Sequence, residues 1–252
     1  RAYYKISEVF NTHCPVWWGV VPVPVSALRK RKCSARHRFI GIDVGASPGG
    51  WTQFLAQYMY TYGNGSGVDS GSDNDSDSVT EVYSAASVLA IDPGDLKQEV
   101  LDLENVIHVP LTVQATETRA FISRTVDSAM DQKLFGLDFM VVCDMNCMTS
   151  DAIDLLCRHV LNHIPRSSNT STSSDTCSKS KSTLGYLYMV LTLKLMKHPK
   201  QTHIDSARRT VSDTLYKYGI VEDHSLNSDN MKCIHINANS LNERTIVCKV
   251  KL

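Results

Sequence analysis

Short apolar runs alternate along the chain with segments in which apolar residues recur every three or four positions. The runs predict β-strands and the periodic segments predict α-helices, because these are the two side-chain periods of the backbone. We expect strands over 39–44, 87–92, 106–111, 137–144, 184–194, 232–237 and 245–251. We expect helices over 51–62, 95–101, 117–133, 150–163 and 202–218, the last one ending at Gly219. This order predicts an α/β fold with a seven-stranded, mostly parallel sheet and helices on both faces.

Two segments interrupt this alternation. Residues 63–79 are rich in Gly, Ser and Asp, and residues 166–183 are nearly all Ser, Thr, Lys and Asn. Neither segment has enough apolar surface to order itself, so both are expected to be disordered surface inserts. With 252 residues and 42% hydrophobic content, residues 1–252 are expected to form a single domain.

The most specific motif follows the apolar run 39–42. It reads D-V-G-A-S-P-G-G-W from Asp43 to Trp51 and predicts a strand, a tight glycine turn and a helix start. In such a turn, backbone N–H groups face a nucleotide-like ligand. Pro48 suits a first helical turn, and Gly49 and Gly50 allow the main chain to approach the ligand. The Gly-x-x-x-Gly-Gly spacing matches neither the dinucleotide-binding nor the P-loop pattern, so NAD and ATP are disfavoured.

Charged residues follow several of the expected strands. Asp92 ends the second strand, where a carboxylate can accept hydrogen bonds from ribose hydroxyls. Asp144 ends the fourth strand and Lys194 the fifth, so both are expected at the carboxyl edge of the sheet. Glu243 precedes the last strand, and Lys5 lies in the first six residues. The candidate tetrad consists of Lys5, Asp144, Lys194 and Glu243.

The motifs together resemble those of the FtsJ-like RNA methyltransferases. D-V-G-A-S-P-G-G-W is similar to their motif I, and R-A-Y-Y-K-I, V-V-C-D-M, L-T-L-K-L and N-E-R-T-I-V are similar to their Lys, Asp, Lys and Glu motifs. The resemblance implies a Rossmann-like fold, S-adenosylmethionine (SAM) as cofactor, and the catalytic tetrad Lys5, Asp144, Lys194 and Glu243. It implies a SAM site made of Asp43, Gly45, Ala46, Ser47, Pro48, Gly49, Gly50, Trp51, Asp92 and Asp144, with no metal.

The implied reaction is methyl transfer to a ribose 2′-hydroxyl in RNA. V-C-D-M and L-K-L-M-K are most similar to the RlmM-type rRNA enzymes, whose N-terminal RNA-binding region is not in this chain. A further RNA-binding domain or protein partner outside the chain is therefore expected. The family's acid that contacts adenine after the third strand has no counterpart here, which leaves Thr112 or a backbone amide for that contact.

The chemistry explains why such residues are needed. A ribose hydroxyl is a poor nucleophile, so the reaction needs a base and a fixed geometry. Lys194 can act as the base if its amine is partly neutral, which burial and the positive charge of Lys5 would favour. Asp144 and Glu243 would hold the two amines by charge-assisted hydrogen bonds. The alternative is a pair of ordinary surface salt bridges.

RNA is the expected partner, although the formal net charge is zero. Basic residues cluster over 29–38 and 194–209, and such clusters either contact phosphates or simply form solvated loops. Tyr3, Tyr4, Trp17 and Trp18 could stack on unpaired bases or pack in the core.

The cysteines and the apolar runs bear on the compartment. The eight cysteines include no C-x-x-C pair and suit reduced core thiols, and the longest apolar runs are broken by Pro22, Pro24 or Lys194. A soluble intracellular protein without a membrane span is expected. A zinc site of Cys143, Cys147, His159 and His163 is disfavoured, because the intervening residues resemble a strand end and a helix start.

Two other functions stay open. Methylation of the mRNA cap ribose uses the same tetrad, but cap binding would need an aromatic sandwich that the sequence does not reveal. A catalytically lapsed RNA- or SAM-binding module is the non-enzymatic alternative. The tetrad argues against that module, whereas the missing adenine-side acid favours it.

Overall fold

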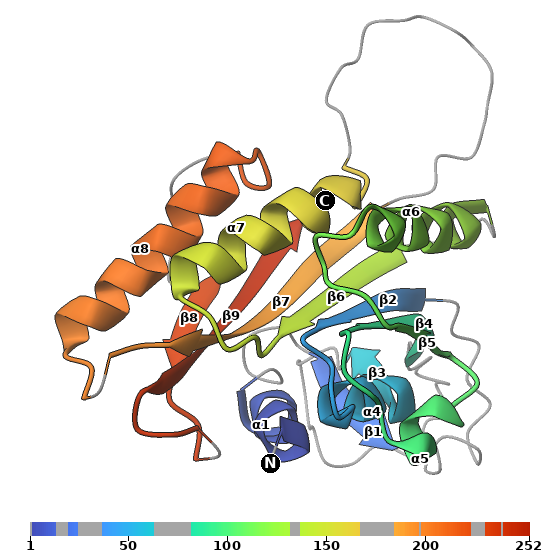
Figure 1. Ribbon diagram of the computed structural model, residues 1–252, viewed down its shortest axis with the longest axis horizontal. Coiled ribbons are helices and arrows are strands. Elements are labelled where there is room, and N and C mark those ends of the chain that lie inside the picture. Colours follow the sequence, from blue (N-terminus) through green and yellow to red (C-terminus); the bar gives the residue numbers. More distant parts are fainter. Residues whose placement is uncertain are drawn as a thin grey trace, which may run out of the picture.

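The computed structural model describes residues 2–13, 20–24, 37–62, 82–131, 137–166, 184–196, 198–222, 230–237 and 239–252. In these residues a single twisted sheet forms the centre of the fold (Figure 1). Within these residues the strand order is β1-β3-β4-β2-β6-β7-β9-β8, with β5 beside β4. The strands are β1 (Val20–Pro24), β2 (His37–Val44), β3 (Tyr58–Tyr62), β4 (Val82–Ile91), β5 (Val106–Val109), β6 (Leu137–Cys143), β7 (Leu184–Lys194), β8 (Met231–Ile234) and β9 (Glu243–Lys251).

The seven strands expected from the apolar runs are all present and form the main body of the sheet. Strands β5, β4, β2, β6 and β7 are mutually parallel, whereas β9 is antiparallel to β7 and β8 is antiparallel to β9. The predicted α/β fold with a mostly parallel sheet is therefore confirmed. Because the central strands are parallel, their carboxyl ends meet at one edge, where ligands bind in folds of this kind.

Two further strands in the described region were not predicted. The helix expected over 51–62 ends at Gln57, and Tyr58–Tyr62 forms β3 instead. Strand β3 pairs antiparallel with β1 and with the start of β4. The run Tyr-Met-Tyr-Thr-Tyr is rich in aromatic and β-branched residues, which favour a strand and here outweigh continuation of the helix.

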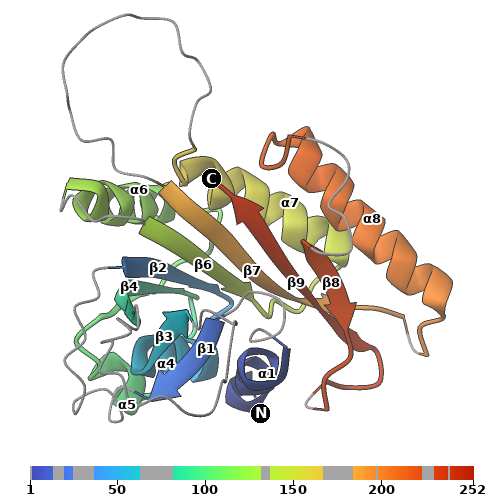
Figure 2. The same ribbon diagram turned by 180° about the vertical axis from the view of Figure 1, so that it is seen from behind.

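Helices cover both faces of the sheet, as predicted (Figures 1 and 2). They are α1 (Ala2–Glu8), which continues as the π-helical turn η1 (Val9–His13), α4 (Gly50–Gln57), α5 (Gln98–Leu101), α6 (Thr116–Asp131), α7 (Thr149–His159), the 3₁₀ turn η2 (Leu161–His163) and α8 (Gln201–Lys217). One face packs against α6, α7 and α8 through Ile122, Ile153 and Val211. The other packs against α1, η1 and α4 through Ile6, Phe10 and Phe54.

Helix α8 ends as its sequence predicts. Ala207, Val211 and Leu215 are buried at helical spacing. Gly219 has a φ of +63°, and the next N–H, of Ile220, donates to the Leu215 carbonyl at 2.8 Å. This is the glycine-terminated cap expected at that position.

Both predicted inserts fall outside the described residues, apart from Arg166. Their disorder and the single-domain organisation therefore stay predictions. None of the described helices has the length and apolarity needed to cross a membrane.

Candidate active site

Four charged side chains from four distant parts of the chain meet at the carboxyl edge of the sheet. Lys5 comes from α1, Asp144 directly follows β6, Lys194 ends β7 and Glu243 begins β9. Lys194 and Glu243 are direct cross-strand partners in the antiparallel β7–β9 ladder. We call this group the tetrad.

The tetrad is a closed network of ion pairs. Lys5 Nζ lies 3.0 Å from Asp144 Oδ2 and 3.1 Å from Glu243 Oε2. Lys194 Nζ lies 3.3 Å from Asp144 Oδ1 and 2.5 Å from Glu243 Oε1. The exposed fraction of the side chain is 5% for Lys5 and 10% for Glu243, but 18% for Asp144 and 20% for Lys194. Lys194 and Asp144 thus face the solvent side, while Lys5 and Glu243 lie beneath them.

The charges balance, with two cations and two anions, as buried charges require. Burial would raise the pKa of Glu243, but hydrogen bonds from Lys194, the Ser240 amide and Lys5 lower it to about 2. The carboxylate therefore stays ionised at any pH near neutrality.

The expectation of a partly neutral Lys194 is wrong for this arrangement. Burial does lower the pKa of Lys194, but the hydrogen bond to Glu243 and the negative charges of Asp144 and Glu243 outweigh burial and raise it above 10.5. Two carboxylates close to the amine favour its charged form more than Lys5 disfavours it.

The glycine turn connects β2 to α4 beside the tetrad. Gly45 has a φ of +81° and Gly49 a φ of +106°, a region that only glycine adopts freely. A Cβ at Gly45 would lie 3.1 Å from Met145 Cγ, and one at Gly49 would lie 2.9 Å from Val100 Cγ2. The packing of Val100 of α5 is therefore a second reason for glycine at position 49, beside the predicted approach of the main chain to a ligand. Pro48 is not in the first helical turn, where it was predicted, since α4 begins at Gly50.

Asp43 lies below the turn rather than on its surface. Its carboxylate is buried and accepts a 2.7 Å hydrogen bond from the Thr52 hydroxyl in the first turn of α4. Burial raises the pKa of Asp43 to about 7, against the hydrogen bond from Thr52, which lowers it. The hydrogen bond between Asp43 and Thr52 thus connects the end of β2 to the first turn of α4 and fixes the position of the glycine turn between them. Thr52 was not among the predicted site residues, although it directly follows the motif in the sequence.

Asp92 joins the turn to the end of β4. Its Oδ2 accepts the Ser47 N–H at 3.2 Å and its Oδ1 accepts the Gly94 N–H at 2.7 Å. Each carboxylate oxygen has two lone pairs, so both oxygens can accept a further hydrogen bond. The Ser47 hydroxyl donates to the Asp95 carbonyl at 2.9 Å, which fixes the same loop from its other side.

These residues fit the cofactor that the motif implies. The turn, Asp92 and Asp144 lie at the carboxyl ends of the adjacent strands β2, β4 and β6. Asp92 retains acceptor capacity for ribose hydroxyls, and Asp144 supplies a carboxylate for a cationic group. Of the other predicted contact residues, Ala46 and Trp51 are buried, Ser47 and Pro48 are exposed, and Gly50 is half-buried. Thr112, the candidate for the adenine side, is exposed just after β5, and its carbonyl accepts the Thr118 hydroxyl at 2.8 Å.

The predicted RNA-contacting residues are only partly within the described chain. Tyr4 is 69% exposed next to Lys5, whereas the Tyr3 ring packs 5.7 Å from Phe54. Trp17, Trp18 and residues 29–36 lie outside the described residues, and so does Lys197. Lys200 and Arg209 are exposed on or just before α8, which follows the carboxyl end of β7.

The thiols show no cluster in the described regions. Cys143, Cys147, Cys157, Cys233 and Cys248 are free, and the first, third and last of these are buried. No group of three or more His, Cys, Asp or Glu side chains in the described part could hold a metal ion.

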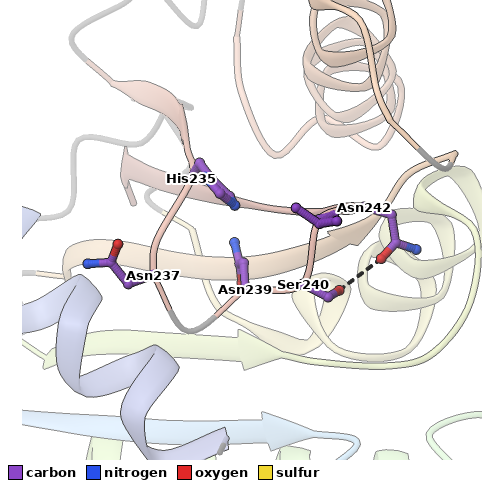
Figure 3. A pocket seen from close by; sticks show the side chains of 6 residues that line it. His235, Asn237, Asn239, Ser240 and Asn242 are labelled. Carbon is purple, nitrogen blue, oxygen red and sulfur yellow. Dashed lines mark hydrogen bonds between the residues drawn. The ribbon is translucent and has the colours of Figure 1, made fainter.

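The sequence patterns did not predict the contribution of the loop between β8 and β9 to the site. The loop between β8 and β9 lines an open pocket with His235, Asn237, Asn239, Ser240, Leu241 and Asn242 (Figure 3). The Ser240 N–H donates to Glu243 Oε2 at 2.9 Å, so this loop directly supports the tetrad. The polar run before Glu243 was the available signal, but it resembled an ordinary turn.

The family of the chain follows from a comparison that agrees with this geometry. The model of the FtsJ-like methyltransferase family matches residues 1–164, which include Lys5, the glycine turn, Asp92 and Asp144. The chain therefore belongs to the FtsJ-like methyltransferase family. Membership indicates a methyltransferase acting in RNA methylation in general, and enzymes of this family generally use SAM. No curated protein matches the chain.

Proposed function

We propose that this protein transfers a methyl group to a ribose 2′-hydroxyl in RNA, and that this RNA is rRNA. The observation that carries the proposal is the Lys5–Asp144–Lys194–Glu243 network. It is completed by Lys194 and Glu243, which lie outside residues 1–164, the part that the family model matches. The position of these two residues is thus an argument independent of the family match.

The cofactor would supply an electrophilic methyl group beside the glycine turn, held by Asp92 and by backbone groups of the turn. The more exposed pair of the tetrad, Lys194 and Asp144, then faces the acceptor ribose. In its neutral form, Lys194 Nζ would take the proton that the ribose hydroxyl gives up, while Asp144 and Glu243 fix the position of that amine. Lys5 neutralises the second negative charge of the network from below.

The raised pKa of Lys194 has a kinetic consequence for this role. Only the small neutral fraction of the amine can accept a proton. At pH values below the pKa, this fraction increases about tenfold with each unit that the pH rises. The rate of methyl transfer should therefore increase with pH through the neutral range.

The experiment that tests the proposal maps 2′-O-methyl groups across total RNA from cells with and without the protein. Loss at one or a few rRNA riboses is expected. Loss at mRNA 5′ ends would instead support the cap reaction, because cap enzymes share the tetrad. If no 2′-O-methyl group is lost, or if a base methyl group is lost, the proposal is wrong.

A further inference from the structure

The pocket beside the β8–β9 loop is uncharged, unlike the tetrad next to it. Its lining, in the part of the loop that the structure describes, consists of amides from Asn237, Asn239 and Asn242, the Ser240 hydroxyl, the His235 ring and Leu241. In Figure 3 the Asn239 and His235 side chains point toward one another and Ser240 is hydrogen-bonded to Asn242, whereas Asn237 projects away from them. Amides both donate and accept hydrogen bonds, so the lining suits a neutral group with both kinds of partner.

Asn239 carries the clearest sign of a missing ligand. The residue is 9% exposed, and its Oδ1 is buried without a hydrogen-bond partner, while its Nδ2 donates to Thr245 Oγ1 at 3.2 Å. In Figure 3 the nitrogen end of the Asn239 amide is the end that points toward His235. Buried polar atoms are nearly always hydrogen-bonded, so an acceptor without a partner among the described residues indicates an N–H or O–H donor that arrives with a ligand.

The loop that lines the pocket is hydrogen-bonded to the tetrad and its neighbour. The Ser240 N–H bonds to Glu243 Oε2 at 2.9 Å, and the Leu195 N–H bonds to the Asn242 carbonyl at 2.8 Å. Its walls are therefore hydrogen-bonded to Glu243 itself and to the residue after Lys194. The far end of the loop is fixed to α1, because the Asn237 N–H donates to Glu8 Oε1 at 2.7 Å.

Leu241 adds an apolar surface at the mouth of the pocket. Its side chain is 72% exposed, although it lies only two residues before the buried Glu243. An exposed leucine beside amides can cover the flat face of a ring while the amides bind its edge.

We infer that this pocket receives the nucleobase of the acceptor nucleotide, an inference that rests on the proposed function. A ribose whose 2′-hydroxyl lies at Lys194 carries its base within one nucleotide of the tetrad, and the lining of the pocket ends at Asn242, the residue before Glu243. Asn239 Oδ1 accepts an N–H from the base edge, Asn242 contacts another polar atom of that edge, and Leu241 packs on its face. Asparagine amides match base edges in this way, and every base has an N–H group on its pairing edge. A phosphate would require cationic groups, which the described lining lacks.

The test uses the ¹⁵N-labelled chain and the four nucleoside 5′-monophosphates as probes, followed by NMR of the asparagine side-chain amides. We expect the amide signals of Asn239 and Asn242 to shift, with at least one nucleotide binding more tightly than the others. Asn239→Ala should weaken that binding about threefold to tenfold, the value of one hydrogen bond. Leu241→Ala, at an exposed position that contributes little to folding, should weaken it as well.

Asn162→Ala is the matched control, because Asn162 is an exposed asparagine in η2, beyond the opposite end of α7, and its side chain accepts a hydrogen bond from Arg166 Nη2. It should leave nucleotide binding unchanged. If no nucleotide shifts the pocket amides, or if Asn239→Ala and Leu241→Ala bind like the control, the inference is wrong. Methyl transfer to RNA in the same preparation would then leave the proposed function intact. Specific shifts without any 2′-O-methyl transfer would contradict the proposed function but not the pocket.

Discussion

Position 49 requires glycine for two reasons, its own backbone conformation and the packing of Val100 against it. A φ of +106° costs a non-glycine residue about 1–3 kcal/mol, and a Cβ would also meet Val100 Cγ2 at 2.9 Å. Gly49→Ala should therefore reduce the free energy of unfolding by at least that amount and weaken SAM binding, as measured by urea denaturation and calorimetry. Adding Val100→Ala should recover only the packing part, since the backbone strain stays. Unchanged stability and SAM affinity in Gly49→Ala would show that the turn tolerates a side chain.

The ionisation of Glu243 links the tetrad to stability. Its pKa in the folded protein is about 2, below the ordinary value of 4.5, so the folded state binds its proton less readily than the unfolded state. This contribution is fully present above pH 4.5 and should be lost as the pH falls from 4.5 to about 2. Urea unfolding at a series of pH values should show a shallower loss in this range for Glu243→Gln than for the parent. Parallel curves for the two proteins would rule out this linkage.

Helix α1 carries Lys5, and its position depends on packing that is remote from the charges. Phe10 in η1 is fully buried, and its ring lies 5.5 Å from that of Phe54 in α4. Phe10→Ala should reduce stability by about 3–5 kcal/mol and also lower the rate of methyl transfer per folded molecule, because Lys5 loses its fixed position.

Ile122→Ala is the control for this helix. Ile122 is equally buried, but it lies in α6 on the opposite face of the sheet. This variant should lose about 2–5 kcal/mol of stability with an unchanged rate per folded molecule. Equal rates in the two variants, each corrected for its folded fraction by circular dichroism, would show that α1 packing does not position Lys5.

The elements that sequence patterns predicted well are those with one dominant signal. A run of apolar residues before Asp144 was enough to place it at the carboxyl edge, because a fully buried strand leaves few alternatives. The predicted β7 and α8 also agree closely with the structure. Strand β1 and helix α1 were missed, although Ile6, Val9 and Phe10 have helical spacing.

The geometry of the site could not be predicted from the spacing of residues alone. Lys5 and Asp144 are 139 positions apart, and only the fold and the β7–β9 register bring the four charges together. The raised pKa of Lys194 depends on the distances to two carboxylates, which a sequence does not contain. The pocket lined by Asn239 depends in the same way on the path of the loop between β8 and β9.

For the whole molecule, a net charge of zero makes the location of the basic residues decisive for RNA binding. Lys200 and Arg209 are exposed on the segment that follows the tetrad strand β7. The Lys200→Glu, Arg209→Glu variant should bind RNA more weakly and with a smaller dependence on salt, because fewer counterions are released. The control Arg124→Glu, Lys217→Glu changes the net charge equally at two other exposed positions. Salt titrations monitored by fluorescence anisotropy that give the same slope for both variants would remove this segment from the RNA site.

The central claim is that the tetrad performs the transfer, and single-turnover methylation of the mapped RNA with labelled SAM tests it most directly. Lys194→Ala should bind SAM normally but transfer methyl groups at least ~10²-fold more slowly, the usual contribution of a positioned base. Lys194→Arg should be nearly as slow, since arginine does not release its proton. The parent rate should increase with pH between about 7 and 9, because the pKa of Lys194 lies above 10.5. A parent rate independent of pH, together with robust transfer by Lys194→Arg, would contradict the account.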